Sequence, residues 1–455
     1  MIVASISLLK EGHRVSVTDL SIGNPFGCDA DPPANWDKLY KWEDQLPQHN
    51  VDMPAPEGKD GRYVLFMNQI QMLGWNNQLN EVLMNSWLAY KSNRTYVFHD
   101  YIWKDDYYPW QNHPSKPSVP RTPLNALISG PSAGGPWAAG DHSPRAISLR
   151  FFDQVCPKHE RKIINTRDVK PIIGSNWIPG DEIFKAWQKI LVDAPERCVE
   201  IQPADRSEDN FPQTFDLWFW GNTRALDMWE DFKNSPVSRL LGTSPIVQSA
   251  VDRNTYLFQP RGSPQFVPKG ASMDPWDRTL AVHIRRGDFK EACQGLAQYN
   301  STFYSWNLHT FLPDKFTHPP GWDVDRETTI ATYIRHCFPE EDSIIEKIHQ
   351  SREDYVKAGR GGDVRYLDTI FILTNDRSEF LSHLKSKLLL DGWNNVVTTR
   401  DLELDQQQKD VGMAVDMDMA RKAAVFLGNG WSSFTSNIVH RRLVDGKEPI
   451  SIRFF

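Results

Sequence analysis

Short apolar runs of strand length recur through the last third of the chain, and they restrict the fold more than any other feature. They lie at 279–284, 369–374, 395–398 and 425–427, and a helical pattern follows each of the last three. When strands alternate with helices, each helix carries the chain back so that the next strand pairs in parallel. The sequence therefore predicts an α/β fold with a parallel sheet in this part of the chain.

The same rhythm occurs nearer the start of the chain. Strands are predicted at 63–67 and 95–99, and a helix with one apolar face is predicted between them at 79–90. Residues 1–60 contain six prolines and little periodicity, which indicates an irregular segment. The expected division is an N-terminal extension at 1–60, a first α/β half at 61–255 and a second at 256–455, with a cleft between the halves.

Composition excludes several classes of protein. With 455 residues, 40% hydrophobic residues and a net charge of −7, the chain is globular and carries no general basic surface for nucleic acid. The five cysteines include no Cys-x-x-Cys pair, which argues against a structural zinc site. The apolar N-terminal stretch is too short to cross a bilayer and lacks the basic start of a signal peptide. We therefore expect no transmembrane segment in this chain.

The strand at 279–284 delivers cationic side chains to its carboxyl end. Because strand residues alternate between faces, His283 and Arg285 share one side while the residues between them enter the core. Arginine presents a planar fork that matches the oxygens of a phosphate, so this pattern favours an anionic ligand. The alternative is an ordinary core strand whose arginines pair with surface carboxylates.

Two further polar clusters follow strands of the same predicted sheet. Asn375 and Asp376 follow the strand at 369–374, and Ser432 and Ser433 open the last helix. Ligands of parallel sheets bind at the carboxyl ends of strands, and the first turn of a helix attracts phosphate. Plain N-capping is the alternative for the serines. Together the three clusters predict a nucleotide diphosphate ligand.

These motifs resemble those of the GDP-fucose protein O-fucosyltransferase-like family. His-x-Arg-Arg-Gly-Asp at 283–288 is similar to the arginine motif of fucosyltransferases that use GDP-fucose. The segment 415–435 looks like the third motif of the family, with Asp416 in its helix, and 74–95 resembles the first, a Gly-aromatic-x-Asn-Gln loop leading into a helix. The three occur in the order of the family.

The resemblance implies a GT-B fold, in which two Rossmann-like domains face each other across a cleft. The N-terminal domain would lie on the acceptor side and the C-terminal domain would bind the GDP-sugar. The implied activity is inverting transfer of fucose from GDP-fucose to a hydroxyl, with Ser or Thr of a protein as the expected acceptor. Members of the family work in the secretory pathway, so the resemblance places the chain in the lumen of the endoplasmic reticulum or the Golgi.

The resemblance also assigns roles to residues. Arg285 would stabilise the departing diphosphate, His283 would lie against the nucleotide, and Asp416 would accept hydrogen bonds from guanine. Asn77 would reach the donor from the opposite domain. The remaining predicted donor-binding residues are Arg286, Asp288, Asn375, Asp376, Ser432, Ser433 and Phe434 in the second half, and Gly74, Trp75 and Asn76 in the first.

No metal or cofactor is expected besides the donor substrate. Asp416-Met417-Asp418 mimics the Asp-x-Asp metal signature of other glycosyltransferases, but residues two apart on a helix do not converge on one ion. The catalytic base is left open. An amide such as Asn77 cannot act as a base at neutral pH, so Glu81, Asp288 or a relayed water are the alternatives.

Other functions remain compatible with the sequence. They are transfer of a different GDP-sugar, transfer to a glycan, and GDP or sugar binding without catalysis. A dehydrogenase is disfavoured because no Gly-x-Gly-x-x-Gly follows a strand, and a serine hydrolase because no Gly-x-Ser-x-Gly elbow occurs.

Overall fold

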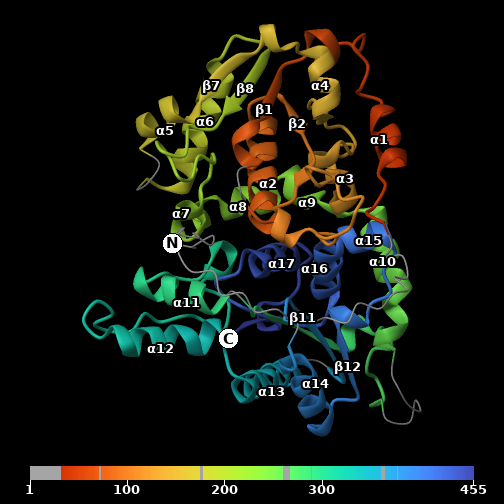
Figure 1. The fold of residues 1–455 in the computed structure, drawn as a ribbon, viewed down its shortest axis with the longest axis vertical. Helices are drawn as coiled ribbons and strands as arrows, with labels where there is room; N and C mark the ends of the chain where they lie inside the picture. Colours follow the sequence, from red (N-terminus) through yellow and green to blue (C-terminus); the bar gives the residue numbers. More distant parts are fainter. Residues whose placement is uncertain are drawn as a thin grey trace.

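The computed structural model describes residues 32–70, 73–174, 178–259, 267–287, 289–359, 364–376 and 378–455. These residues form two five-stranded parallel sheets, one in each half of the chain (Figure 1). The first has the order β6-β2-β1-β8-β7, and its strands are β1 (Tyr63–Phe66), β2 (Thr95–Phe98), β6 (Ile147–Ser148), β7 (Lys162–Asn165) and β8 (Cys198–Gln202). The second has the order β12-β11-β10-β13-β14, and its strands are β10 (Thr279–Ile284), β11 (Thr369–Thr374), β12 (Asn395–Thr398), β13 (Val425–Gly428) and β14 (Ile452–Phe454).

Helices cover both faces of each sheet, which confirms the predicted α/β class with two Rossmann-like domains in the GT-B manner. The helices of the first half are α1 (Asp37–Asp44), α2 (Trp75–Lys91), α3 (Leu124–Leu127), α4 (Leu149–Val155), α5 (Thr166–Ile173), α6 (Gly180–Asp193), α7 (Leu217–Trp220), α8 (Trp229–Asn234), α9 (Pro236–Arg239) and α10 (Pro245–Asn254). Those of the second half are α11 (Phe289–Gln298), α12 (Arg326–Cys337), α13 (Glu341–Lys357), α14 (Phe380–Leu390), α15 (Gln406–Asp410), α16 (Gly412–Lys422) and α17 (Ser433–Val444). Two small antiparallel ribbons add β3 (Tyr101–Ile102) with β4 (Arg121–Thr122) and β5 (Ile128–Ser129) with β9 (Gly242–Thr243).

The strands read as apolar runs because both of their faces are buried. On β10, Ala281 faces one core while Leu280 and Val282 face another, and all six residues of the strand are buried. A parallel sheet with helices on both sides requires this continuous burial. The predicted strands 279–284, 369–374 and 395–398 match β10, β11 and β12, because their β-branched and aromatic residues suit a doubly covered sheet.

A cluster of aromatic rings joins the two halves. Trp306 of the second half lies with its ring centroid 4.9 Å from that of Trp229 and 5.7 Å from that of Phe232, both in α8 of the first half. All three side chains belong to one buried cluster that extends into both domains. The relative placement of the domains therefore rests on a shared apolar core.

The segment expected to be irregular contains a helix. Within 32–60 the helix α1 forms, and the flanking Trp36 and Leu46 are buried in the main core. Trp36 Nε1 donates a hydrogen bond of 3.0 Å to Asp410 of α15, so this segment also contacts the second half. Residues 1–31 lie outside the described part of the chain.

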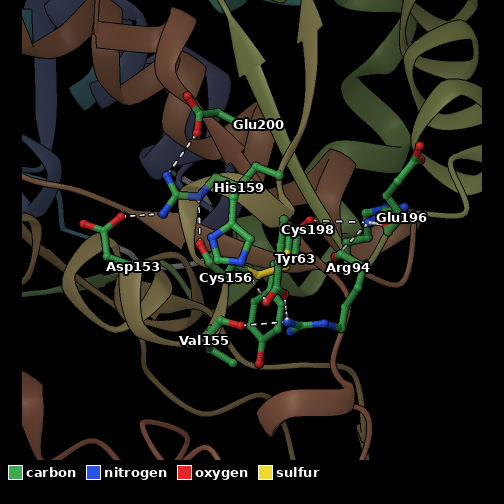
Figure 2. The surroundings of a disulfide bond; sticks show 12 residues. Tyr63, Arg94, Asp153, Val155, Cys156, His159, Glu196, Cys198 and Glu200 are labelled. Carbon is green, nitrogen blue, oxygen red and sulfur yellow. Dashed lines mark hydrogen bonds and ion pairs between the residues drawn. A yellow bond between two sulfur atoms is a disulfide. The ribbon is translucent and has the colours of Figure 1, made fainter.

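Each domain carries one disulfide bond. In the first, Cys156 at the end of α4 is bonded to Cys198 at the start of β8 (Figure 2). Arg161 donates to the carbonyl of Cys156 and pairs with Asp153 and Glu200. In the second, Cys293 of α11 is bonded to Cys337 of α12. The bonded cysteines are 42 and 44 residues apart in the sequence. Cross-links that close loops of this length restrict the unfolded chain and stabilise the fold by about 4 kcal/mol each.

Among the described residues, no helix has both the length and the apolar character needed to cross a bilayer.

Candidate functional site

The carboxyl edge of the second sheet gathers several predicted site residues. β10 ends at Ile284 and leads to Arg285, while β13 ends at Gly428 and leads through a turn into α17. A side chain at position 428 would bring its Cβ within 2.6 Å of Thr435, so glycine lets α17 approach the strand closely. The end of β10 and the first turn of α17 therefore lie side by side.

His283 is part of this junction and is neutral. Its Nδ1 lies 3.1 Å from the hydroxyl of Thr435, and its ring centroid lies 4.6 Å from that of Phe434. Burial, together with the neighbouring Arg285, lowers the pKa of His283 to about 3. The imidazole thus adds no charge to the site and holds Phe434 in place.

The adjacent arginines have different surroundings. Arg285 is half-buried, and its guanidinium carbon lies 5.5 Å from the ring centroid of Phe289. Arg286 is buried between the rings of Phe338 and Phe380, at 4.2 Å and 3.9 Å, and donates to the carbonyl of Pro339. The Arg286 side chain is therefore engaged by contacts within the protein, which argues against the predicted ligand contact for this residue.

Asn375 also has a positioning role. Its Oδ1 accepts a hydrogen bond of 2.8 Å from the backbone N–H of Arg286, and its Nδ2 donates to the carbonyl of the same residue at 2.9 Å. The end of β11 thus fixes the backbone that follows Arg285. Asp376 accepts from the N–H and the hydroxyl of Ser378, both at 2.6 Å. Asp288 lies outside the described residues.

Asp416 is the most unusual carboxylate of this edge. Its Oδ2 accepts a hydrogen bond of 3.1 Å from Thr399, which follows β12, whereas its Oδ1 is buried and has no hydrogen-bond partner in the protein. Burial raises the pKa of Asp416 to about 7. A buried acceptor without a partner is costly, so this oxygen is suited to a ligand that donates hydrogen bonds.

Asp418 points to a different part of the molecule. Its Oδ1 accepts from the hydroxyl of Thr243 at 2.5 Å and from Arg421 at 3.4 Å. The carboxylates of Asp416 and Asp418 therefore bind separate groups on two sides of α16. In the described part of the chain, no three His, Cys, Asp or Glu side chains are grouped as the ligands of a metal ion would be.

Ser432 and Ser433 begin α17 at the same edge. Both are half-buried, and the hydroxyl of Ser432 makes no capping bond to the helix. The N-capping alternative for Ser432 is therefore wrong. The first N–H groups of the helix and its dipole favour an anion at this position.

The first motif of the chain meets this edge from the other domain. Asn437 of α17 donates to the carbonyl and side-chain oxygens of Asn76 at 2.9 Å and 3.2 Å, and Tyr304 donates to Oδ1 of Asn77 at 3.1 Å. Gly74 is exposed at the N-cap of α2, while Trp75 is buried, with its ring centroid 5.5 Å from that of Tyr101. The carboxyl edges of both sheets thus face each other, and Trp75 belongs to the core.

The proposed base Glu81 is enclosed in the first domain. It is 1% exposed, and its Oε1 accepts a hydrogen bond of 3.4 Å from Trp220 Nε1. Burial raises the pKa of Glu81 to about 8. Its enclosure argues against direct contact with an acceptor hydroxyl.

Sequence reasoning missed the partners that orient the site, which are Thr399, Tyr304, Thr435 and Asn437. Tyr304 was visible only as one of several aromatic residues after the arginine motif, and Thr435 only as part of the third motif. Each contacts a residue more than fifteen positions away, and such contacts leave no periodic signal in a single sequence.

No family model matches the sequence, and no curated protein matches it either. The chain is similar to solved structures of fucosyltransferases. A structure of POFUT1 in complex with GDP is 15% identical, with 86% of this chain and 98% of that one covered and a TM-score of 0.48. A structure of POFUT1 with GDP-fucose is 14% identical, with coverages of 87% and 97% and a TM-score of 0.45. The NodZ alpha-1,6-fucosyltransferase soaked with GDP-fucose is 11% identical, with coverages of 83% and 91% and a TM-score of 0.37.

Proposed function

We propose that this chain is an inverting glycosyltransferase that moves fucose from GDP-fucose to a hydroxyl acceptor, Ser or Thr of a protein. One observation carries the proposal. Arg285, the open start of α17 and the unpartnered Oδ1 of Asp416 all belong to the carboxyl edge of one parallel sheet. That edge is where nucleotides bind in folds of this class.

Arg285 supplies the positive charge for the reaction. When the acceptor oxygen bonds to C1 of the sugar, the bond from C1 to the phosphate oxygen breaks and negative charge grows on the diphosphate. A fixed guanidinium stabilises that charge most at the transition state. The N–H groups at the start of α17, with Ser432 and Ser433, bind the other phosphate oxygens. No metal takes part in this proposal.

Asp416 gives the site its preference for guanine. The Watson–Crick edge of guanine carries two neighbouring N–H donors, which an ionised carboxylate accepts and which uracil cannot match. Because burial raises the pKa of Asp416 to about 7, the ionised form increases between pH 6 and pH 8. Affinity for GDP should therefore rise over this range.

The first domain closes the acceptor side. Asn77, bonded to Tyr304, faces the same edge and binds the donor from across the domain boundary. Since Glu81 is enclosed, the proton of the acceptor hydroxyl leaves through water in this proposal. The two disulfides suit an oxidising compartment, so the proposed location is the lumen of the endoplasmic reticulum or the Golgi.

Calorimetry with GDP, GDP-fucose, GDP-mannose and UDP tests the nucleotide class, and a hydrolysis assay tests the sugar. We expect the guanine nucleotides to bind at least tenfold more tightly than UDP, and GDP-fucose to be hydrolysed or transferred faster than GDP-mannose. Equal binding of GDP and UDP would contradict the proposed role of Asp416.

A GDP-sugar-binding protein without catalysis is the second candidate. The enclosure of Glu81 and the amide at Asn77 favour it, because neither side chain can take a proton from an acceptor at this edge. It predicts tight binding of GDP-fucose with no hydrolysis and no transfer to any acceptor. The same two assays separate the candidates.

A further inference from the structure

A cavity lies between the domains, on the side of the C-terminal sheet opposite to the proposed donor site. Its volume is about 620 Å³. Its charged lining consists of Arg421, Lys422, Arg441, Lys447, Asp274, Asp277 and Asp445. We refer to it as the rear cavity.

The position of the rear cavity follows from the topology. Asp274 and Asp277 precede β10, and Arg421 and Lys422 end α16 just before β13, so the cavity lies at the amino edge of the sheet. The residues of the proposed donor site lie at the carboxyl edge. The helix α16 contributes Asp416 to the donor site and Arg421 to the cavity, and α17 contributes Ser433 to the donor site and Arg441 to the cavity.

Arg441 is the central feature of this cavity. It is 6% exposed, and among the described residues the only hydrogen-bond acceptor recorded for its guanidinium is the carbonyl of Leu241, bound by Nη1. The side chain lines the rear cavity and also a water-sized chamber of about 20 Å³ that shares part of its wall. A guanidinium has five N–H donors, and the carbonyl of Leu241 accepts from only one of its nitrogens, so Arg441 retains donors for which the described part of the protein offers no further acceptor.

The neighbouring carboxylates are already engaged. Arg421 binds both oxygens of Asp445, at 2.5 Å and 2.8 Å, and also contacts Asp418 at 3.4 Å. Lys422 lies 3.6 Å from the second oxygen of Asp418. No carboxylate is therefore bonded to Arg441, although Asp445 and Asp418 lie close enough to interact with its charge.

The rest of the wall suits a sugar-sized molecule. Trp276 is half-buried, lines the cavity and rests against Phe258, with the ring centroids 4.6 Å apart. Lys447 also lines the cavity, is half-buried and donates to the carbonyl of Lys422 at 3.2 Å. A flat aromatic face combined with cations and carboxylates binds both the apolar and the hydroxyl-bearing parts of a small polar ligand.

We propose that the rear cavity binds an oxyanion, a phosphate, sulfate or carboxylate group, carried by a sugar-sized molecule. The planar fork of Arg441 would bind the oxyanion, Lys447 would add charge, and Trp276 would pack against the ring of the ligand. The proposal is independent of GDP-fucose, because none of these residues belongs to the proposed donor site.

Calorimetric titration of the whole chain with inorganic phosphate, inorganic sulfate, glucuronate and glucose 6-phosphate tests the proposal, at constant ionic strength set with chloride. We expect saturable binding of at least one probe, with the ring-bearing anions binding more tightly than the inorganic ones. Arg441→Gln and Lys447→Ala should each weaken it, the former by about tenfold or more. Lys189→Ala, which removes an exposed charge on α6, is the matched control and should change nothing.

The variants also identify where the anion binds. Arg285→Ala should leave the titration unchanged if the anion occupies the rear cavity. Should Arg285→Ala or saturating GDP abolish the binding, the anion occupies the donor site and the proposal is wrong. Absence of saturable binding for all four probes, or unchanged binding by both the Arg441→Gln and the Lys447→Ala protein, would equally overturn it. Circular dichroism confirms that each variant is folded.

Discussion

The carboxyl edges of the two sheets both carry polar side chains, but these side chains differ in whether the protein itself satisfies their hydrogen bonds. At the edge of the first sheet, the polar side chains that open α2 are bound by protein: Asn76 by Asn437, and Asn77 by Tyr304. At the edge of the second sheet, Asp416 keeps a buried oxygen without a partner, and Ser432 makes no capping bond. In the proposed function, the second domain would therefore bind the ligand through its own unsatisfied groups, whereas the first would close the site.

Substitution of Arg285 should have the largest effect. Arg285→Lys keeps the charge but loses the planar fork, so we expect transfer or hydrolysis of GDP-fucose to fall by about 10²–10³-fold with the fold intact. Steady-state kinetics measure it. Arg286→Lys is the matched comparison: because that guanidinium packs between two rings, it should lower the melting temperature instead. Equal losses of activity in both variants would contradict the different roles of these neighbours.

Asp416→Asn should have the next largest effect, on nucleotide binding. An amide offers guanine one acceptor at the most and one repelling donor, so GDP should bind about 10–100-fold more weakly while UDP changes little. The variant should also lose the rise in GDP affinity between pH 6 and pH 8 that the wild type shows. Calorimetry at several pH values checks both statements, and an unchanged pH profile would count against Asp416.

The same substitution has an effect on stability of known sign. Because burial raises the pKa of Asp416 from 3.8 to about 7, the folded protein binds its proton more tightly than the unfolded chain, and this contribution to stability is lost progressively as the pH rises from 3.8 to about 7. The asparagine avoids a buried charge at pH 8. We expect the melting temperature of the variant to exceed that of the wild type by about 2–4 °C at pH 8, with a smaller gain at pH 5.

Asn77→Ala should affect the site less than either change in the second domain. It removes one donor contact and leaves Tyr304 bonded to Asn80 Nδ2, so we expect about a threefold to tenfold loss of kcat/KM for GDP-fucose. Ser433→Ala is the matched variant in the second domain, because it also removes one small polar group from the proposed donor site. If Asn77→Ala lowered kcat/KM for GDP-fucose as much as Arg285→Lys does, the first domain would contribute as much to donor binding as the second, which contradicts the proposed difference between them.

Chelation should have the smallest effect. The proposed reaction uses Arg285 where other transferases use a divalent ion, so we expect EDTA to leave turnover unchanged within error. Full inhibition by EDTA that added Mn²⁺ restores would make the metal reading of Asp416 and Asp418 correct after all.

The second sheet could be predicted closely from the sequence, whereas the first could not. The strands β10, β11 and β12 are continuous apolar runs, and their bounds were predicted. The strands β6, β7, β8 and β14 were missed. The strands β6 and β14 have only 2 and 3 residues, β7 is partly exposed and contains polar residues, and β8 mixes apolar with polar residues. Short edge strands depend on pairing with neighbours, which local sequence does not encode.

For the site, the sequence motifs indicated which residues lie near it but not which of their side chains contact other parts of the protein. The sequence predicted ligand contacts for Arg285 after a strand and for Asp416 in a helix, and it predicted them for Arg286, Asn375 and Trp75 as well. The structure shows these three engaged with protein, in ring contacts, a backbone bridge and the core. Which member of a polar motif faces a ligand depends on side chains brought from distant segments, so a single sequence cannot distinguish them.

A crystal structure of the chain with GDP tests the central claim most directly. The account predicts guanine hydrogen-bonded to the Oδ1 of Asp416, and the diphosphate between Arg285 and the first turn of α17. A nucleotide bound elsewhere, for example in the rear cavity against Arg441, would contradict it.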